Sequence, residues 1–213
     1  MSSLPSDQRI IEQLRESGGV MLMLSERHVA TIRRIAETLI AAYRAGKKVV
    51  ACGNGGSAAD AQHIVAELVG RLELPRRPAL AAVALTTNAS VLTAIGNDFG
   101  FDQVFARQIE ACVERGDVVV ALSTSGNSPN VLVAVRRAKA LGAATIGLTG
   151  ASGGALSEAV DLALLVPSDS PQRVQEAHLT VGHIVCAIVE SEMFGVRGRG
   201  SSRAGAEPRR MPR

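Results

Sequence analysis

The sequence contains no tryptophan, one tyrosine and four phenylalanines among its 213 residues, so aromatic rings can supply little of its core. Hydrophobic residues still make up 46% of the chain, and the core must therefore be built from Ala, Val, Leu and Ile. Buried parallel strands and the helices that cover them usually have this composition. The length suffices for one domain with a sizeable core, and two domains would be cramped.

Cysteines and long apolar runs are also scarce. Cys52, Cys112 and Cys186 are far apart and form no CxxC pair, which is typical of reduced core residues in a cytosolic protein. No apolar run reaches the ~20 residues that a membrane span needs. The N-terminus lacks the basic region and apolar stretch of a secretory signal. We therefore expect a cytoplasmic protein that makes no membrane contact.

Apolar residues are nearly absent from residues 195–213, which hold six Arg and one Glu. This segment carries a net charge of +5 and residues 1–194 carry −2, so the pI of 9.1 comes from the end of the chain. Such a composition cannot offset the entropy of folding, and we expect a disordered Arg-rich tail after a single domain over residues 1–194. The tail has no aromatic residue for base stacking, so we interpret it as a solvated extension and expect no nucleic-acid partner.

The stretch from Val49 to Arg71 has the clearest local pattern. Residues 49–52 form a short apolar run that is typical of a buried parallel strand. The sequence Gly-Asn-Gly-Gly-Ser at 53–57 then allows a sharp turn, and an alanine-rich helix is predicted to follow. Backbone N–H groups and the positive end of the helix dipole would converge at this loop, which suits an anion. His63 and Glu67 are one turn apart on the predicted helix and should project from one face.

Residues 7–46, which precede this stretch, have helical spacing and no strand signal. Gly18 and Gly19 should loosen a first helix, and Ser25 suits the N-cap of a second. Because these helices come before the first strand and have little sheet to cover, we expect them to pack against another subunit.

The rest of the chain alternates between strand and helix patterns. Strands are predicted at residues 79–85, 118–122, 144–148 and 162–166, helices at 90–95, 104–115, 130–141 and 173–194, and a loop at 96–100. This alternation predicts a parallel sheet wrapped on both faces. Ligands of such sheets lie outside the C-terminal ends of the strands. The polar loops at 53–57 and 123–128 both follow predicted strands, so we expect them to share one site.

The second polar loop, Ser-Thr-Ser-Gly-Asn-Ser at 123–128, carries four hydroxyl groups before a helix. Hydroxyls and free N–H groups in this position can bind a phosphate without a lysine. One Ser or Thr would suffice for an N-cap, so the surplus favours phosphate binding. The loop has no GK[ST] sequence and residues 53–57 do not match GxGxxG, so we expect neither nucleotide hydrolysis nor a dinucleotide.

The predicted closing helix adds further candidate side chains. Gln175 and His183 are eight residues apart and look to the same side of this helix, whereas His178 is turned away and should be packed. Gln175 and His183, together with His63 and Glu67, could bind one zinc ion and leave room for substrate oxygens. Alternatively, Glu67 and His183 could act as base and acid on opposite sides of a carbon chain, and the two roles overlap.

Asn97 and Asp98 lie in the loop predicted at 96–100, between glycines and phenylalanines. Asp98 could hydrogen-bond substrate hydroxyls. An Asx turn would use the same side chain, and the spacing does not decide between the two.

Four motifs in order resemble the sugar isomerase (SIS) domain and, more narrowly, the phosphoheptose isomerase family. They are CGNGGSAADAQH with Glu67 four residues on, AIGNDFGFD at 94–102, STSGNS at 123–128, and Gln175-Glu176 followed by His183. The similarity extends to about residue 194 and leaves out the Arg-rich tail. The resemblance implies an α/β fold with a five-stranded parallel sheet and helices on both faces, a flavodoxin-like three-layer sandwich preceded by N-terminal helices. It also implies a cytoplasmic homotetramer.

The activity implied by the resemblance is that of an aldose–ketose isomerase, an intramolecular oxidoreductase. It would convert sedoheptulose 7-phosphate to D-glycero-D-manno-heptose 7-phosphate through an enediol, the first step toward activated heptose. Carried over by motif, Glu67 and His183 would be the proton-transfer pair, and one Zn²⁺ per subunit would be held by His63, Glu67, Gln175 and His183. The substrate-binding residues would be Asn54, Gly55, Gly56, Ser57, Glu67, Asn97, Asp98, Ser123, Thr124, Ser125, Ser128 and Gln175.

This sequence departs from some members at one position, and other functions occur on the same domain. Some members carry an acidic residue three before the motif glutamine, where this chain has Gln172 with Asp169 nearby. Non-enzymatic relatives bind the replication initiator or sense a sugar phosphate, and the initiator-binding ones tend to lack the helix glutamate and the closing-helix histidine. Because Glu67 and His183 are both present, the enzyme is favoured. A pentose phosphate isomerase would usually bring additional regulatory domains, for which we expect no room here.

Overall fold

The computed structural model describes residues 7–195, which fold around a five-stranded parallel sheet. Its strands are Val49–Gly53 (β1), Ala82–Ala84 (β2), Val118–Ser123 (β3), Ala144–Thr149 (β4) and Leu162–Leu165 (β5). Their order in the sheet is β2-β1-β3-β4-β5, which is the flavodoxin-like order that the resemblance implies. The connection after β1 leads to one side of the sheet, toward β2, and the connection after β3 leads to the other side, toward β4. A crevice for ligands is therefore expected at the C-terminal ends of β1 and β3.

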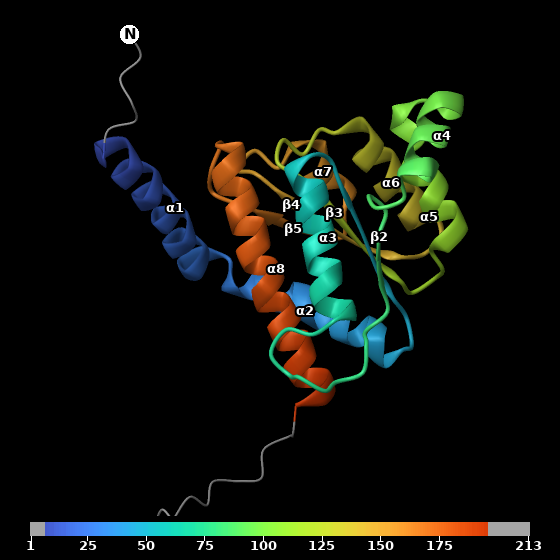
Figure 1. Cartoon of the computed structure of the whole chain (residues 1–213), viewed down its shortest axis with the longest axis horizontal. Helices are drawn as coiled ribbons and strands as arrows, with labels where there is room; N and C mark the ends of the chain where they lie inside the picture. Colours follow the sequence, from blue (N-terminus) through green and yellow to red (C-terminus); the bar gives the residue numbers. More distant parts are fainter. Residues whose placement is uncertain (1–6, 196–213) are drawn as a thin grey trace, which may run out of the picture.

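Helices cover both faces of the sheet (Figure 1). They are Asp7–Arg27 (α1), Val29–Arg44 (α2), Gly56–Val69 (α3), Ala89–Phe99 (α4), Ala106–Cys112 (α5), Pro129–Ala140 (α6), Gly154–Ala159 (α7) and Pro171–Phe194 (α8), with a 3-10 turn at Phe101–Gln103. Alternate residues of each strand face opposite sides. Val49, Val118 and Val120 pack with α2, α3 and α8, whereas Val50 and Val119 pack with α5, α6 and α7.

The two N-terminal helices behave differently from each other. The apolar face of α2 is buried in the core through Ile35 and Leu39, and α2 contacts β3, β5 and α8. The expectation that both helices lack sheet to cover is therefore wrong for α2, because α3 and α8 leave room for it on the same face. In contrast, α1 leads away from the body and leaves Ile10, Leu14 and Leu22 exposed (Figure 1).

Three local predictions were wrong, and one helix was missed. α1 continues through the Gly18-Gly19 pair because Val20 and Leu24 are buried in the core, and the Ser25 hydroxyl donates to the carbonyl of Leu22 inside the same helix instead of capping α2. α4 runs to Phe99 and so includes most of the loop predicted at 96–100. α7, which begins at a pair of glycines with positive φ, was not predicted at all.

Within the described residues, the cysteines are free, with Cys52 and Cys186 buried and Cys112 half-buried. No helix of residues 7–195 combines the length and the apolar character that crossing a membrane requires. Most of the Arg-rich tail, residues 196–213, lies outside the described part of the chain, so its predicted disorder stays a prediction.

Candidate active site

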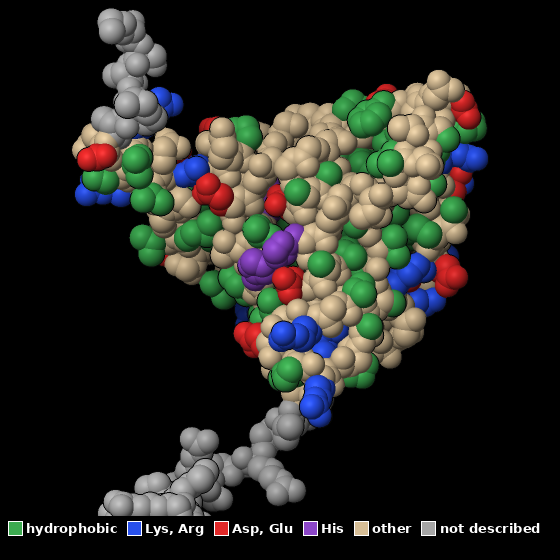
Figure 2. All heavy atoms as spheres, in the orientation of Figure 1, with side chains coloured by type: hydrophobic (Ala, Val, Ile, Leu, Met, Phe, Trp, Pro, Cys, Tyr) green, Lys and Arg blue, Asp and Glu red, His purple; other side chains and the backbone are tan. Residues whose placement is uncertain are grey.

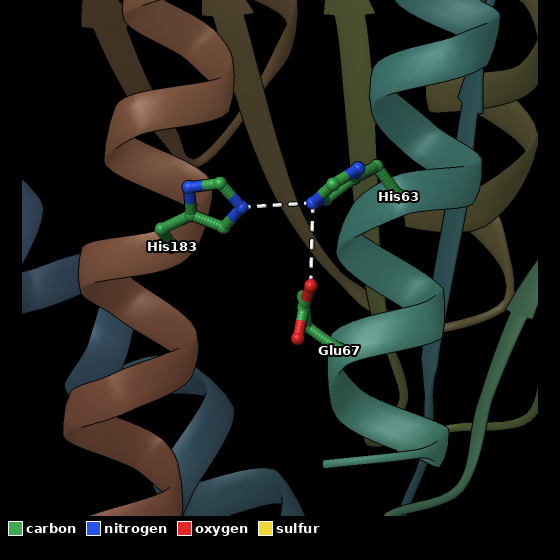
Figure 3. Close-up of side chains that lie close together, drawn as sticks. All are labelled: His63, Glu67 and His183. Atoms are coloured by element: carbon green, nitrogen blue, oxygen red, sulfur yellow. Dashed lines mark hydrogen bonds and ion pairs between the residues drawn. The ribbon is translucent and has the colours of Figure 1, made fainter. Parts of the chain in front are cut away.

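Three side chains predicted from the sequence converge between α3 and α8. The Nε2 atom of His63 lies 2.8 Å from Nε2 of His183 and 3.2 Å from Oε1 of Glu67 (Figure 3). One ligand atom from each residue lies within 4.8 Å of the other two. The cluster opens to solvent, since the side chain of His63 is 44% exposed and that of Glu67 is 19% exposed. Figure 2 shows histidine side chains gathered with an acidic neighbour on this face.

The close approach of α3 and α8 depends on Gly182, the residue before His183. A Cβ atom at this position would lie 2.7 Å from Cγ1 of Ile64, the residue after His63. Any side chain at residue 182 would therefore push the helices apart or displace Ile64. The missing Cβ lets two helices that are far apart in the sequence bring their histidines into contact.

The three side chains carry too few protons to satisfy the contacts between them, which favours a cation shared by all three. A neutral imidazole carries one proton on its two nitrogens, and an ionised carboxylate carries none. Nε2 of His63 faces both His183 and Glu67, so one N–H cannot make both contacts in good geometry. Nitrogen atoms bound to one tetrahedral zinc ion at 2.0–2.1 Å would lie about 3.4 Å apart. The donor set therefore fits zinc after the two rings separate by about half an ångström.

The glycine loop lies at the other end of this helix pair, where it meets Gln175. Gly55 has a φ of +56°, which explains the need for glycine at the start of α3. A Cβ at Gly56 would lie 2.5 Å from the side-chain amide of Gln175. Gln175 thus lies against the glycine loop, about 12 Å along α8 from His183. Ser57 is buried at the beginning of α3.

The two polar loops meet as predicted, through a residue that the sequence did not reveal. The side-chain amides of Asn54 and Asn130 form a reciprocal pair, with N···O distances of 2.9 Å in both directions. Asn130 is buried in the first turn of α6 and also accepts a hydrogen bond from the N–H of Val131. An Asn after Ser-Pro signals only a helix start, so its partner 76 residues earlier could not be inferred.

The hydroxyl groups at 123–128 are not used to cap the helix that follows. Ser128 is the N-cap residue of α6 but makes no side-chain capping bond, and its Oγ lies 2.9 Å from Oγ of Ser123. Ser125 is exposed and its Oγ accepts from the N–H of Asn127, while Thr124 is half-buried. Gly126 has a φ of +67° and lies against the Gly153 carbonyl, which locks the loop conformation. Hydroxyl groups thus line the start of α6, as phosphate binding would require.

Asn97 and Asp98 are not brought to the three-residue cluster within this chain. They lie in the last turn of α4, both exposed, and Nδ2 of Asn97 donates to Oδ1 of Asp98 over 2.7 Å. Figure 1 shows α4 well separated from α8.

Two buried titratable groups border the candidate site. His178 is fully buried, as predicted, and burial lowers its pKa to about 4 although its Nε2 lies 3.4 Å from the Thr149 carbonyl. Asp60 lies one turn before His63, and sequence analysis overlooked it. Burial raises the pKa of this carboxyl group to about 6, against the opposing effect of His63.

Comparison with known proteins places this geometry in a family. The model of the SIS domain matches residues 14–150. A phosphoheptose isomerase of Geobacter sp. (strain M21) is 51% identical over 187 residues, which cover 88% of this chain and 97% of the relative. The phosphoheptose isomerase of Clostridium acetobutylicum is 53% identical over 168 residues, covering 79% and 85%. A solved phosphoheptose isomerase structure from Neisseria gonorrhoeae matches with a TM-score of 0.82 and 42% identity, covering 86% of this chain and 98% of that one.

Proposed function

The chain belongs to the phosphoheptose isomerases of the SIS-domain family, and we propose that it converts sedoheptulose 7-phosphate to D-glycero-D-manno-heptose 7-phosphate. This is an aldose–ketose isomerisation and supplies the first step toward activated heptose. The proton-transfer roles are assigned from one observation. Glu67 converges with two histidines from helices far apart in the sequence. A carboxylate and an imidazole in contact range are what proton transfer between neighbouring carbons needs.

In the proposed mechanism, Glu67 removes a proton from C1 of the open-chain ketose, and an enediol forms. His183 transfers the proton between the two oxygens, and the proton on carbon returns at C2. Nε2 of His63 lies 3.2 Å from Oε1 of Glu67 and so holds the carboxylate within the three-residue cluster. Each proton transfer by a positioned side chain contributes about 10²–10⁴-fold to the rate.

The polar loops would hold the far end of the substrate. His63 follows Gly56 by seven residues, so the cluster lies about 10 Å along α3 from the glycine loop. A seven-carbon chain with a terminal phosphate can span such a distance. Phosphate bound by Ser123, Thr124, Ser125 and Ser128 would therefore leave C1 and C2 near Glu67, and its binding energy would orient the reacting carbons. Asn54, Gly55, Gly56, Ser57 and Gln175 would contact the substrate from the glycine loop, with Asn97 and Asp98 as further proposed contacts.

We propose that His63, Glu67 and His183 hold one Zn²⁺ per subunit. Gln175, the fourth ligand that the motif implies, lies against Gly56 and would have to turn toward His183 to reach the same ion. The convergence of three electron-pair donors supports the first three, and Gln175 is assigned from its motif. When bound, the ion would polarise the carbonyl and hydroxyl oxygens of the substrate and stabilise negative charge on them.

We also propose a cytoplasmic homotetramer without a nucleic-acid or membrane partner. The apolar residues that α1 leaves exposed support association, as does the apolar groove between α1, α2 and α8, which is lined by Met21, Val29, Ile184 and Ile188. Light scattering should give four times the chain mass of 22.2 kDa. A monomer at micromolar concentration would contradict the proposal.

The decisive test is turnover of sedoheptulose 7-phosphate by the purified protein before chelation, after chelation and after zinc is restored. Loss on chelation and recovery with zinc would support both the reaction and the metal. A Glu67→Gln variant should keep the fold and lose turnover, and near-normal turnover would remove Glu67 as the base. Folded protein that converts nothing under any of these conditions would instead favour a non-enzymatic regulator.

A further inference from the structure

A buried ion pair lies behind the candidate active site. The side chains of Arg77 and Glu190 are both 2% exposed, and Nε of Arg77 lies 2.9 Å from Oε2 of Glu190. The same carboxylate accepts backbone hydrogen bonds from Leu72 over 2.8 Å, from Glu73 over 2.9 Å and from Leu74. One side chain of α8 thus holds the whole segment that follows α3.

The charge state of Glu190 matches this environment. Burial by itself would raise the pKa of the carboxyl group. The hydrogen bonds from Leu74, Leu72, Arg77 and Glu73 outweigh that effect and lower the pKa of Glu190 below its usual range. Glu190 is therefore a charged acceptor whose donors all come from the segment between α3 and β2.

Arg77 reaches the backbone of Glu67. Its Nη2 donates to the Glu67 carbonyl over 2.5 Å, and its Nη1 donates to the Pro78 carbonyl over 2.9 Å. Because α3 ends at Val69, the Glu67 carbonyl is among the last four of the helix, which have no partner inside it. A guanidinium group there satisfies that carbonyl and complements the negative end of the helix dipole.

These contacts tie together the two helices that carry the proposed proton-transfer residues. Glu190 follows His183 by seven residues, two turns along the same side of α8. We propose that Arg77 and Glu190 are positioning residues that set the separation of Glu67 and His183 by clamping the C-terminal turn of α3 to α8. Neither side chain reaches the reacting atoms in this scheme, and the inference rests on the proposed function.

A merely structural role and a positioning role predict different kinetics. If the pair only stabilises the fold, its loss lowers the melting temperature but leaves kcat unchanged wherever the protein is folded. If it positions Glu67, a displacement of about 1 Å can lower kcat by as much as 10²-fold in a folded protein. KM should change little, because the hydroxyl groups at 123–128 would bind the phosphate. They belong to the end of β3 and the start of α6, a helix that covers the opposite face of the sheet from α3 and α8.

Two variants of Arg77 separate charge from geometry. Arg77→Met leaves Glu190 with its three backbone donors, so the segment keeps its main anchor. Arg77→Lys restores the charge beside Glu190 but lacks the planar fork that reaches Glu190, Glu67 and Pro78 together. Glu192→Gln is the matched control, because Glu192 lies two residues further along α8 in an exposed pair with Arg44 at 3.3 Å.

The experiment measures kcat and KM for sedoheptulose 7-phosphate at 25 °C, together with ¹⁵N spectra of the histidine rings. The chain has four histidines, so His63 and His183 can be assigned. We expect both Arg77 variants to be folded, to lose about 10- to 100-fold in kcat, and to keep KM within about threefold. The ring nitrogens of His63 and His183 should shift in both variants and stay unchanged in Glu192→Gln.

The outcomes distinguish this proposal from the proposed function. An inactive wild-type protein would overturn the proposed function, and the histidine spectra alone would then decide the positioning role. Wild-type kcat in either folded Arg77 variant, with unchanged ring nitrogens, would overturn the positioning role while the proposed function stands. If neither variant folds, the pair is a folding determinant and the positioning role is rejected.

Discussion

Replacing Gly182 by alanine should separate the two helices that build the candidate active site. The added Cβ would lie 2.7 Å from Cγ1 and 3.0 Å from Cδ1 of Ile64. Carbon atoms in ordinary contact are about 3.5–4.0 Å apart, so roughly 1 Å must be recovered by moving Ile64 or the helices. Because Ile64 is buried and its branched side chain has few allowed rotamers, we expect the helices to move.

The substitution should lower stability only slightly but lower kcat strongly. Overpacking costs about 1–3 kcal/mol, and the better helix propensity of alanine returns about 1 kcal/mol. The net loss of about 0–2 kcal/mol should lower the melting temperature by no more than roughly 8 °C in a chain of this length. The same shift would move Nε2 of His63 and His183 from 2.8 Å to about 3.8 Å apart, which should lower kcat by about 10²-fold.

Steady-state turnover at 25 °C and thermal unfolding by circular dichroism would measure both effects. Gly19→Ala is the matched control, because a Cβ at this helical glycine of α1 meets nothing within 4 Å. The double variant Gly182→Ala/Ile64→Ala removes the clashing atoms and should recover kcat, even though the lost isoleucine costs about 2–5 kcal/mol of stability. Wild-type kcat in folded Gly182→Ala would refute the reasoning, as would a double variant as slow as the single one.

Three further predictions concern the loops and a buried histidine. Ser128→Ala should raise KM for the sugar phosphate by about 10- to 100-fold, since a hydrogen bond to a charged group contributes about 1.5–3 kcal/mol, and an unchanged KM would contradict a phosphate site there. Asn130→Leu leaves the Asn54 amide unpaired and should lower the free energy of unfolding in urea by about 1–3 kcal/mol, whereas no loss would show that the pair contributes nothing. The pKa of His178 is about 4 in the folded state and about 6.5 in the unfolded state, so its contribution to stability is complete above pH 6.5 and is lost as the pH falls toward 4. Between pH 7 and 4.5 this loss should reach about 2 kcal/mol, and a His178→Gln variant should lack it in urea titrations at the two pH values.

The sequence was sufficient for the sheet and for the loops at its edge. Valine-rich runs such as residues 118–122 can only be strands buried on both faces, and the glycine and hydroxyl residues that follow them mark sharp turns into helices. In a parallel sheet these turns must fall on one edge, which is why the meeting of 53–57 with 123–128 could be predicted. His63 with Glu67, and Gln175 with His183, could likewise be assigned to helix faces from their spacing.

Which helix lies beside which was decided only by the tertiary structure. The period of a helical pattern says which face is buried, but it does not name the neighbour that buries it. The place of α2 on the sheet therefore could not be predicted, nor could the separation of α4 from the cluster. The contact of His63 with His183 depends on the absence of a side chain at Gly182, which has meaning only once α3 lies against it. In the sequence, Glu190 is simply an acidic residue near the end of a helix. Only the folded chain surrounds it with the donors that keep it charged and buried.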